Sequence, residues 1–422
     1  MREMKDSGVE WIGEIPVDWE LSKIGSVYDE RNEKVSDKDF APLSVTKQGI
    51  VPQLETAAKT DNGDNRKLIR KDDFVINSRS DRRGSCGISE YEGSCSLINT
   101  VLKPQTNMCN RYYGFVFKSD SFADEYYRWG HGIVDDLWST KWIDMKSIYI
   151  PAPDIAEQER IADYLDVKCS KIDEIIEKQQ AIIEKLREYK LSIITEIVTK
   201  GLKHNVKMKD SGVRFVDTIP YDWENRKMIT ILSTRVVDGP HEGPELYDRG
   251  IPYISATAIV NGKIDFSLMR GYISKEYCEI CDKRYSPQRG DLLVVKLGAS
   301  TGQVAIVDTD ERFNIWVPLA AVRCNDEALP KFVYYAFQSD YFVRQMELSW
   351  TFGTQQTLGV QTIEKLRILL PPIAEQRKIV KFLDTIYDYI GSKIEKVEKM
   401  IEKLEEYKKS LIYEVVTGKK EV

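Results

Sequence analysis

The fold is decided by the stretch IAEQERIADYLDVKCSKIDEIIEKQQAIIEKLREYKLSIITEIVTKG, residues 155–201. It returns as IAEQRKIVKFLDTIYDYIGSKIEKVEKMIEKLEEYKKSLIYEVVTGKK, residues 373–420. Matching residues, such as Leu186 and Leu404, are 218 positions apart, and no insertion or deletion interrupts this register. The length of the element is therefore the same in both copies.

Each copy has the sequence character of a long helix. Apolar residues alternate at three- and four-residue spacing, Glu and Lys are dense, and no proline follows the opening. About 44 residues predict a rod of about 65 Å, and spacing near 3.5 predicts a coiled-coil seam with the other copy as partner. Two unrelated surface helices are the alternative. The residues expected to pack between the helices are Leu165, Ile172, Leu186, Tyr189, Leu383, Ile390, Leu404 and Tyr407, and the expected stripe also includes Ile175, Ile182 and Met400.

The composition bounds the class of protein. With 422 residues the chain can hold two or three domains, and 42% hydrophobic residues suffice for sizeable cores. The net charge of −6 gives no general attraction to nucleic acid, so such a partner would need local basic patches or other subunits. No run reaches the roughly 18 apolar residues that span a bilayer. We expect a soluble, cytoplasmic protein with no membrane partner.

The cysteines and histidines do not form a metal motif. Seven cysteines are an odd number without framework spacing. Cys278 and Cys281 form a CxxC pair, but zinc would require a second pair, and His131, His204 and His241 are scattered. We expect free thiols and no metal site rather than a zinc centre.

A second repeat precedes each helix. MKDSGVEWIGEIPVDWE, residues 4–20, returns as MKDSGVRFVDTIPYDWE, residues 208–224, which is an offset of 204. A period near 200 residues indicates a duplicated domain rather than a solenoid. We expect a first globular domain at 1–152, a spacer helix at 153–202, a second globular domain at 203–371 and a second spacer helix at 372–422.

The two globular segments have the pattern of mixed α/β domains. The first contains the extended runs APLSVTKQGIVPQL, DDFVINSRS and SLINTVLKP, followed by an expected helix at 111–129. The second contains VDGPHEGPELYDRGIPYISATAIVNGKIDF and GDLLVVKLGASTGQVAIV, then an expected helix near 331–348 and the loop TFGTQQTLG. Asp73-Phe-Val-Ile matches Asp291-Leu-Leu-Val at the 218 offset, so we expect a shared fold with divergent loops.

In the order of its segments, their repetition and their motifs, the chain resembles the specificity subunit of a type I restriction-modification system. The likeness is carried by GVEWIGEIPVDWE and its second copy, VDGPHEGPELYDRGIPYIS, RGDLLVVKLGASTGQ, PAPDIAEQER and PPIAEQRK, and it covers essentially the whole chain. The first domain departs from the pattern because it lacks the DGPH phrase. It also has Gly132-Ile-Val-Asp where the second domain has Gly353-Thr-Gln-Gln.

The resemblance implies two target recognition domains at opposite ends of two antiparallel coiled-coil helices, with pseudo-twofold symmetry. Each domain would read one half of a split double-stranded DNA target, and the helices would set the spacer. Two methyltransferase (modification) subunits would bind this platform, and motor-nuclease (restriction) subunits would join them for cleavage. S-adenosylmethionine, ATP and magnesium are then expected on those partner subunits, with no cofactor in this chain.

Basic and polar loop residues are the expected DNA contacts. Phosphate contacts are expected from Arg70, Lys71, Arg82, Arg83 and Lys296. Base contacts are expected from Lys47, Gln48, Asn77 and Arg79 in the first domain, and from His241, Ser255, Thr257, Ser300, Gln303, Gln355 and Gln356 in the second. A solvated charged edge is the alternative for the basic cluster, and turn formation is the alternative for the polar residues.

We expect no catalytic residues in this chain. The only Pro-Pro, at 371–372, lacks the polar and aromatic neighbours of adenine methyltransferases, and Gly298-Ala-Ser-Thr-Gly is not followed by the lysine of a phosphate loop. Asp154 is expected to cap its helix rather than to act in a nuclease site, because the second copy lacks this carboxylate. Gln158 and Gln376 are expected to orient the helix starts, with partner binding as the alternative.

Two other functions remain open from the sequence. One is the same DNA-reading role in a related system, whose methyltransferase and nuclease are fused in one partner. The other is a coiled-coil adaptor with two protein-binding heads and no DNA partner, which the acidic net charge allows and the recurring motifs argue against.

Overall fold

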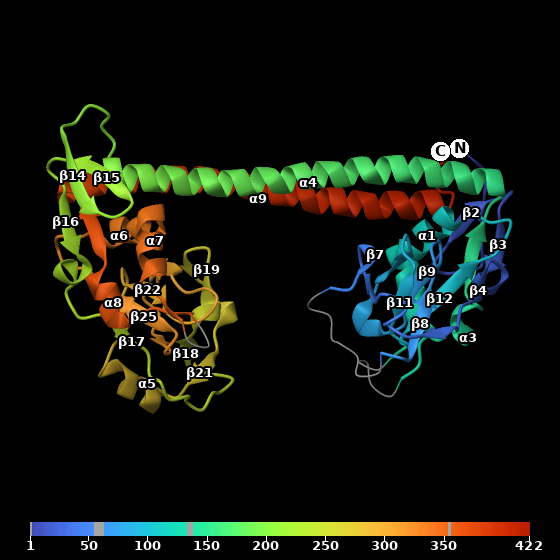
Figure 1. Ribbon diagram of the computed structural model, residues 1–422, viewed down its shortest axis with the longest axis horizontal. Coiled ribbons are helices and arrows are strands. Elements are labelled where there is room, and N and C mark those ends of the chain that lie inside the picture. The colour runs from blue at the N-terminus through green and yellow to red at the C-terminus, as the bar shows by residue number, and fades with distance from the viewer. Residues whose placement is uncertain (1, 55–62, 133–137, 353–355) are drawn as a thin grey trace. The chain divides into compact units, whose positions relative to one another are not determined.

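The computed structural model describes residues 2–54, 63–132, 138–352 and 356–422, and the chain divides into two compact units (Figure 1). Unit 1 comprises Met1–Gln180 and Glu398–Val422, and unit 2 comprises Ala181–Val397. Each unit combines one globular domain with parts of both long helices, α4 (Ile155–Lys200) and α9 (Ile373–Val416). No helix within the described ranges is both long enough and apolar enough to span a membrane.

Unit 1 is built around a four-stranded antiparallel sheet in the order β10-β9-β12-β4. These strands are Cys86–Ile88, Phe74–Asn77, Asn99–Pro104 and Tyr28–Glu30. A smaller sheet contains β11 (Gly93–Cys95), β8 (Arg66–Ile69) and β5 (Lys34–Val35), and hairpins join β1 (Met4–Asp6) to β2 (Glu14–Pro16) and β6 (Leu43–Thr46) to β7 (Gly49–Pro52). Strand β3 (Glu20–Lys23) pairs with β13 (Tyr149–Ala152), which leads into α4. The short helix α3 is Trp142–Met145.

Unit 2 repeats this plan. Its four-stranded antiparallel sheet has the order β17-β25-β22-β23, with strands Val237–Asp238, Leu319–Val322, Leu292–Val295 and Val304–Ile306. A three-stranded sheet contains β21 (Gly271–Ile273), β18 (Ile251–Ile254) and β24 (Asn314–Ile315). Unit 2 also contains the hairpins β14 (Met208–Val213)/β15 (Val216–Pro220), β19 (Ile259–Val260)/β20 (Lys263–Ile264) and β26 (Thr351–Phe352)/β27 (Gln356–Thr357). Strand β16 (Glu224–Lys227) pairs with β28 (Arg367–Leu370), which leads into α9. The short helices are α5 (Lys275–Asp282) and α8 (Val360–Lys365).

The mixed α/β class is confirmed, but both helices expected in the globular segments are broken. The range 111–129 forms α1 (Asn110–Lys118) and α2 (Asp120–Arg128), and the range near 331–348 forms α6 (Pro330–Gln338) and α7 (Asp340–Leu348). The break lies at Ser119 and at Ser339, whose backbones are extended. The Ser119 hydroxyl accepts a hydrogen bond from the backbone of Phe122, so this serine ends one helix and caps the next.

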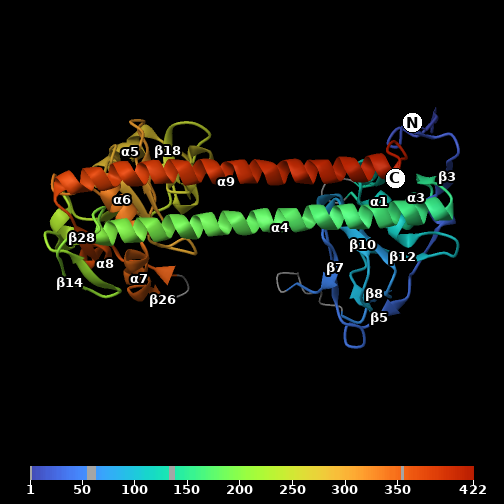
Figure 2. The ribbon, with the colours of Figure 1, turned by 90° about the horizontal axis from the view of Figure 1, so that it is seen from above.

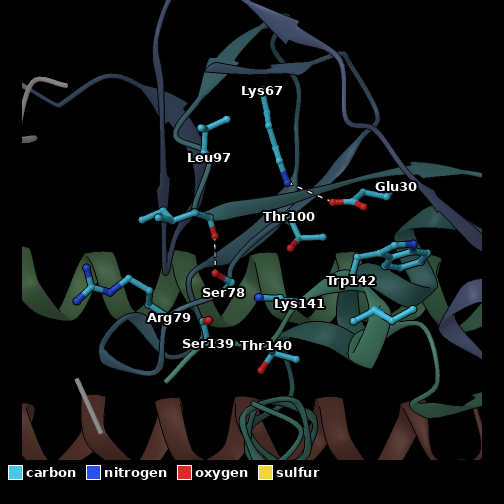
Figure 3. A pocket seen from close by; sticks show the side chains of 12 residues that line it. Glu30, Lys67, Ser78, Arg79, Leu97, Thr100, Ser139, Thr140, Lys141 and Trp142 are labelled. Atoms are coloured by element: carbon cyan, nitrogen blue, oxygen red, sulfur yellow. Dashed lines mark hydrogen bonds and ion pairs between the residues drawn. The ribbon is translucent and has the colours of Figure 1, made fainter. Parts of the chain in front are cut away.

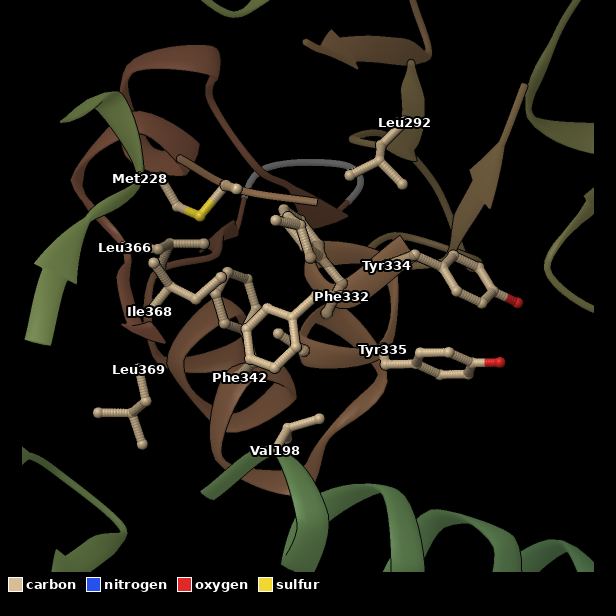
Figure 4. Close-up of a cluster of buried hydrophobic side chains, with 14 of the residues drawn as sticks. Val198, Met228, Leu292, Phe332, Tyr334, Tyr335, Phe342, Leu366, Ile368 and Leu369 are labelled. Carbon is tan, nitrogen blue, oxygen red and sulfur yellow. The ribbon is translucent and has the colours of Figure 1, made fainter. Parts of the chain in front are cut away.

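In each domain the first part of the broken helix packs against an edge strand of the four-stranded sheet, α1 against β10 and α6 against β23, and the long helices complete both cores. In unit 2, Phe332 and Phe342 of the broken helix pack with Leu292 of β22 (Figure 4). Val198 of α4 lies in the same cluster. In unit 1, Leu165 of α4 and Leu411 of α9 are buried in one cluster with Phe117 and Phe122. The ends of the long helices are therefore structural parts of the globular domains, which explains why each unit contains parts of both.

The long helices contact each other inside each unit, where they lie side by side in Figures 1 and 2. In unit 1, Lys408 of α9 pairs with Asp173 of α4 at 2.6 Å. In unit 2, the ammonium of Lys190 on α4 lies 4.2 Å from the ring centroid of Tyr387 on α9. Of the residues expected to pack between the helices, Leu165, Ile172, Leu383 and Ile390 are buried, and Leu186 and Leu404 are partly buried.

Two of the expected packing residues are corrected, because Tyr189 and Tyr407 are 59% and 51% exposed. Ile175, Ile182 and Met400 of the expected stripe are also exposed. For Ile175, Ile182 and Met400 the cause is that each is followed by a second apolar residue, which allows two stripes one position apart. The chain buries the second of each pair, so that Ile183 is buried and Ile176 and Ile401 are partly buried.

Candidate nucleic-acid interface

The two globular domains place divergent loops at the same position of the same fold. Strand β9 ends at Asn77 and β22 at Val295, and the next residues are Ser78 and Lys296. The Ser78 amide donates to the carbonyl of Ile98, and the Lys296 amide donates to that of Pro318. Ile98 directly precedes β12, and Pro318 directly precedes β25, which is the neighbouring central strand in each sheet. The main-chain frame is therefore shared while the side chains that it presents differ.

In the first domain this strand end borders a hollow of about 680 Å³ (Figure 3). Lys67 forms an ion pair with Glu30 at 3.2 Å, and the Ser78 hydroxyl donates to the Ile98 carbonyl. The basic side chains of the lining outnumber its single carboxylate, which favours an anionic ligand. The lining consists of Glu30, Lys67, Ser78, Arg79, Leu97, Ile98, Thr100, Ser139, Thr140, Lys141, Trp142 and Ile143.

Of the base contacts expected in the first domain, Arg79 lies in this hollow and Asn77 does not line it. Arg79 forms an ion pair with Asp81 at 3.1 Å and is about one-third exposed. Asn77 is buried, and its side-chain oxygen accepts a hydrogen bond from the Arg79 amide. The Asn77 carboxamide oxygen thus shapes the loop that carries Arg79, and its burial argues against a base contact. Lys47 and Gln48 lie exposed at the tip of the β6–β7 hairpin.

The expected phosphate contacts of the first domain are all exposed. Arg70 pairs with Glu92, Arg83 pairs with Asp124, and Arg82 lies near Asp81. Lys71 is exposed at the turn before β9. Exposed ion pairs contribute little to stability and exchange readily, so these side chains can reorient toward a phosphate.

In the second domain the expected phosphate contact Lys296 is corrected. Its side chain is buried, and its ammonium lies 2.9 Å from Oδ2 of Asp238, a residue of β17 that is also buried. Burial alone would raise the pKa of the Asp238 carboxyl, but its hydrogen bond with Lys296, helped by Arg284 and His241, lowers the pKa below its ordinary value. Lys296 therefore neutralises a buried carboxylate rather than facing solvent.

The Asp238 carboxylate also contacts two exposed side chains, those of Arg284 and His241. Oδ1 accepts from Arg284, and Nε2 of His241 lies 3.4 Å from Oδ2. Gly239 follows directly, and a Cβ at this position would collide with the carbonyl of Ile315 and the backbone of Trp316. The DGPH phrase thus needs glycine for a close approach between two strands, and it presents His241 to solvent.

The remaining residues expected in the second domain fall into two groups. Ser255 is buried at the end of β18, and Thr257 is exposed and donates to the carbonyl of Leu268. Ser300 and Gln303 belong to the loop 296–303, which is tied to β27 because the Gly298 amide donates to the carbonyl of Gln356. Gln303 is exposed and Gln356 is partly buried, whereas Gln355 lies outside the described residues. Burial argues against a base contact by Ser255.

Sequence reasoning missed Asp238 and Arg284, and in the first domain Lys141 and Trp142. Asp238 lies inside the DGPH phrase, in which the sequence predicts a base contact for the histidine only. Arg284 follows α5 and reaches Asp238 across 46 residues. Only the tertiary fold brings Asp238 and Arg284 together. An aspartate predicted to be buried in a short strand would nevertheless have indicated a cation nearby.

The glutamines at the helix starts have structural partners. Gln158 donates to the carbonyl of Pro153 and accepts from the Cys109 amide, and Gln376 donates to Pro371 and accepts from the Leu329 amide. Both are buried, so they fasten each long helix to the loop before α1 or α6. The Glu157 amide donates to Asp154, as expected for a capping residue.

The described ranges contain no group of three or more His, Cys, Asp or Glu side chains that could hold a metal ion. Cys278 and Cys281 are buried free thiols on α5. Burial raises the pKa of both, which makes them poor nucleophiles.

Comparison with known proteins places these features in a family. The sequence pattern described as the type I restriction modification DNA specificity domain matches the chain twice, at residues 16–188 and 240–406. The type I restriction enzyme MjaVIII specificity subunit of Methanocaldococcus jannaschii is 23% identical, over 96% of this chain and 93% of that protein. The type I restriction enzyme EcoBI specificity subunit of Escherichia coli is 24% identical, over 65% of this chain and 59% of that protein.

A solved structure supports the fold. One chain of a structure described as "Structural basis underlying complex assembly and conformational transition of the type I R-M system" has a TM-score of 0.68 with this chain. The sequence identity is 14%, and the match covers 95% of this chain and 98% of that one. With two matches to the specificity domain over most of its length, this chain belongs to the family of type I restriction-modification specificity subunits.

Proposed function

We propose that this chain is the DNA-reading subunit of a type I restriction-modification complex. Each globular domain reads one half of a bipartite double-stranded DNA target, and α4 and α9 pair as an antiparallel coiled coil that sets the spacing between the halves. Methyltransferase subunits dock on this platform, and motor-nuclease subunits join them.

One observation carries the proposal. Strands β9 and β22 hold the same place in sheets of the same order, yet they present an exposed Arg79 hollow in one domain and the Asp238–Lys296 cluster in the other. A duplicated protein with one ligand would be expected to keep one site. The two domains share a backbone fold but differ in their loops, and each is followed by a long helix whose residues recur 218 positions apart. This arrangement suits two different half-sites at a fixed separation.

The exposed apolar residues of the long helices support partner docking. Ile175, Ile182 and Tyr189 recur every seven residues on α4, and Met400 and Tyr407 follow the same spacing on α9. The pairs Ile182/Met400 and Tyr189/Tyr407 are each 218 positions apart. Apolar side chains that recur at heptad spacing outside the buried seam favour contact with a further helix. Because both long helices carry this surface, two copies of one partner could bind, one to each helix.

Catalysis is assigned to the partners. S-adenosylmethionine would serve the methyltransferase subunits, and ATP and magnesium would serve the motor-nuclease subunits. This chain would supply phosphate contacts from Arg70, Lys71, Arg82 and Arg83, and base contacts from Arg79 and His241. Lys47, Gln48, Thr257, Ser300, Gln303, Gln355 and Gln356 remain proposed contacts.

The test is to co-express the chain with the methyltransferase encoded beside it and to map methylated bases across the host genome. We expect a split motif, modified in both halves and lost when this chain is omitted. Exchanging residues 21–151 for the matching segment of another specificity subunit should change one half only. If active methyltransferase co-purifies with the chain and no chain-dependent motif appears, DNA reading is refuted in favour of an adaptor. A single partner carrying both methyltransferase and nuclease domains would identify the related fused system.

A further inference from the structure

Arg284 is an exposed member of the Asp238 cluster. It lies just after α5, and one of its terminal nitrogens donates to Oδ1 of Asp238. The Asp238 side chain is 8% exposed, whereas that of Arg284 is 51% exposed. One terminal nitrogen of the guanidinium is therefore held by a buried carboxylate, while about half of the side chain remains exposed.

The carboxylate itself is firmly held. Asp238 lies in β17 opposite Ala320 of β25, and the adjacent Gly239 packs on the backbone of Trp316. Its second oxygen contacts Lys296 and His241. Asp238 thus has little freedom to follow Arg284, and the sheet provides a fixed acceptor for one nitrogen of the guanidinium.

Charge balance indicates that Arg284 is not needed to neutralise Asp238. Lys296 is as buried as Asp238 and already supplies one positive charge to one negative charge. Arg284 adds a positive charge at the surface, and His241 adds a further donor. An arrangement that served stability alone would be complete with the buried pair, so the exposed cation is available for a ligand.

A fixed guanidinium fits a base better than a phosphate. Phosphates accept contacts from mobile cations in many geometries, whereas guanine presents two acceptors, O6 and N7, that require a planar pair of donors in one orientation. Holding an arginine in place before binding lowers the conformational entropy lost in the complex. The first domain has Ser78 at the position of Lys296 and lacks the DGPH phrase, so this device belongs to the second domain only.

We propose that Arg284, positioned by Asp238, reads a guanine in the half-site of the second domain. This inference rests on the proposed function, because it assigns one base contact within it. Asp238 is a positioning residue that acts through Arg284, and Lys296 keeps the Asp238 carboxylate charged.

The experiment compares methylation motifs for the wild-type chain and for the variants Arg284→Lys, Arg284→Ala and Asp238→Asn, each co-expressed with the methyltransferase. Arg284→Lys keeps the charge and can keep the ion pair but removes the planar fork. We expect discrimination at one G·C pair of one half-site to fall by about 10- to 100-fold, while the other half-site is unchanged. Asp238→Asn should relax the same position to a smaller extent.

Arg289→Lys is the matched control, since Arg289 is 54% exposed in the same unit and pairs with Asp310 on the surface. It should leave the motif unchanged. Thermal unfolding of each purified complex identifies any variant that fails to fold. In that case the motif of Arg284→Lys, which keeps the positive charge, decides whether Arg284 reads a guanine.

Several results would overturn the inference while leaving the proposed function intact. These are a wild-type half-site for the second domain without a G·C pair, a variant motif unchanged at every position, or a uniform loss of methylation that indicates a phosphate contact. The absence of any chain-dependent motif with the wild-type chain would instead overturn both proposals.

Discussion

The indole nitrogen of Trp19 donates a hydrogen bond to Oε2 of Glu157 over 3.1 Å. Trp19 belongs to the repeated phrase that opens each globular domain, and Glu157 belongs to the repeated start of each long helix. The second copy forms the same bond, from Trp223 to Glu375 over 3.2 Å. The two repeated motifs therefore join each domain to its long helix.

Replacing Trp19 by phenylalanine should lower the free energy of unfolding by about 1–3 kcal/mol, because Glu157 is buried and loses a charge-assisted donor. Denaturant unfolding measures this change. Trp11→Phe is the control, since the Trp11 indole nitrogen is buried without a hydrogen-bond partner in the described structure. Equal losses in the two variants would show that the Trp19–Glu157 bond contributes nothing specific.

The helix seam can be distinguished from the exposed stripe with two isoleucines three residues apart. Ile172 is 7% exposed and Ile175 is 42% exposed on the same helix. Ile172→Ala should cost about 2–5 kcal/mol of stability, because it leaves a cavity, whereas Ile175→Ala should cost less than about 1 kcal/mol. Thermal or denaturant unfolding decides between them, and the reverse order would contradict the assigned seam.

The exposed tyrosines should matter for assembly and not for folding. Tyr407→Glu and Tyr189→Glu should greatly weaken co-purification with the methyltransferase, because a charge is then buried at the proposed contact, while the unfolding temperature of the free chain stays unchanged. Tyr389→Glu is the control, because Tyr389 is equally exposed on α9 but lies outside the heptad spacing of the stripe. Retained assembly in both stripe variants would rule out this docking surface.

Lengthening both helices together should lengthen the DNA spacer. One heptad inserted after Gln179 and one after Val397, which are 218 positions apart, preserve the register of the repeat. Seven residues add about 10 Å, which corresponds to about 3 base pairs of DNA. Methylation mapping should show unchanged half-sites with the longer spacer, and an unchanged spacer in an active variant would refute the role of the helices as a ruler.

Alkaline pH should destabilise unit 1 through its buried thiols. Burial raises the pKa of Cys86 to about 12 and that of Cys95 to about 11, from an ordinary value near 9. Above pH 9 the unfolded chain therefore loses these protons first, so stability falls as pH rises toward 11–12. Each thiol contributes a slope of about 1.4 kcal/mol per pH unit in this window. Unfolding measured from pH 8 to 10.5 should show the decline, and Cys86→Ala should reduce its slope.

The sequence alone determined the duplicated order of domain and helix, the two long helices and the family resemblance. These features depend on local periodicity and on exact repetition, which a single chain displays directly. The sequence does not reveal the breaks at Ser119 and Ser339, because serine is tolerated inside helices and the extended backbone at both positions is visible only in the fold.

The tertiary structure decided which residues of each repeat face inward and which site residues meet. Periodicity cannot separate Ile182 from Ile183 when both are apolar, and only the folded chain buries Ile183 and exposes Ile182. Likewise Lys296 carries the same charge whether exposed or buried, and the fold alone placed it on Asp238 beside Arg284. Residue type and spacing fix local geometry, but burial and charge pairing arise from contacts between segments distant in sequence.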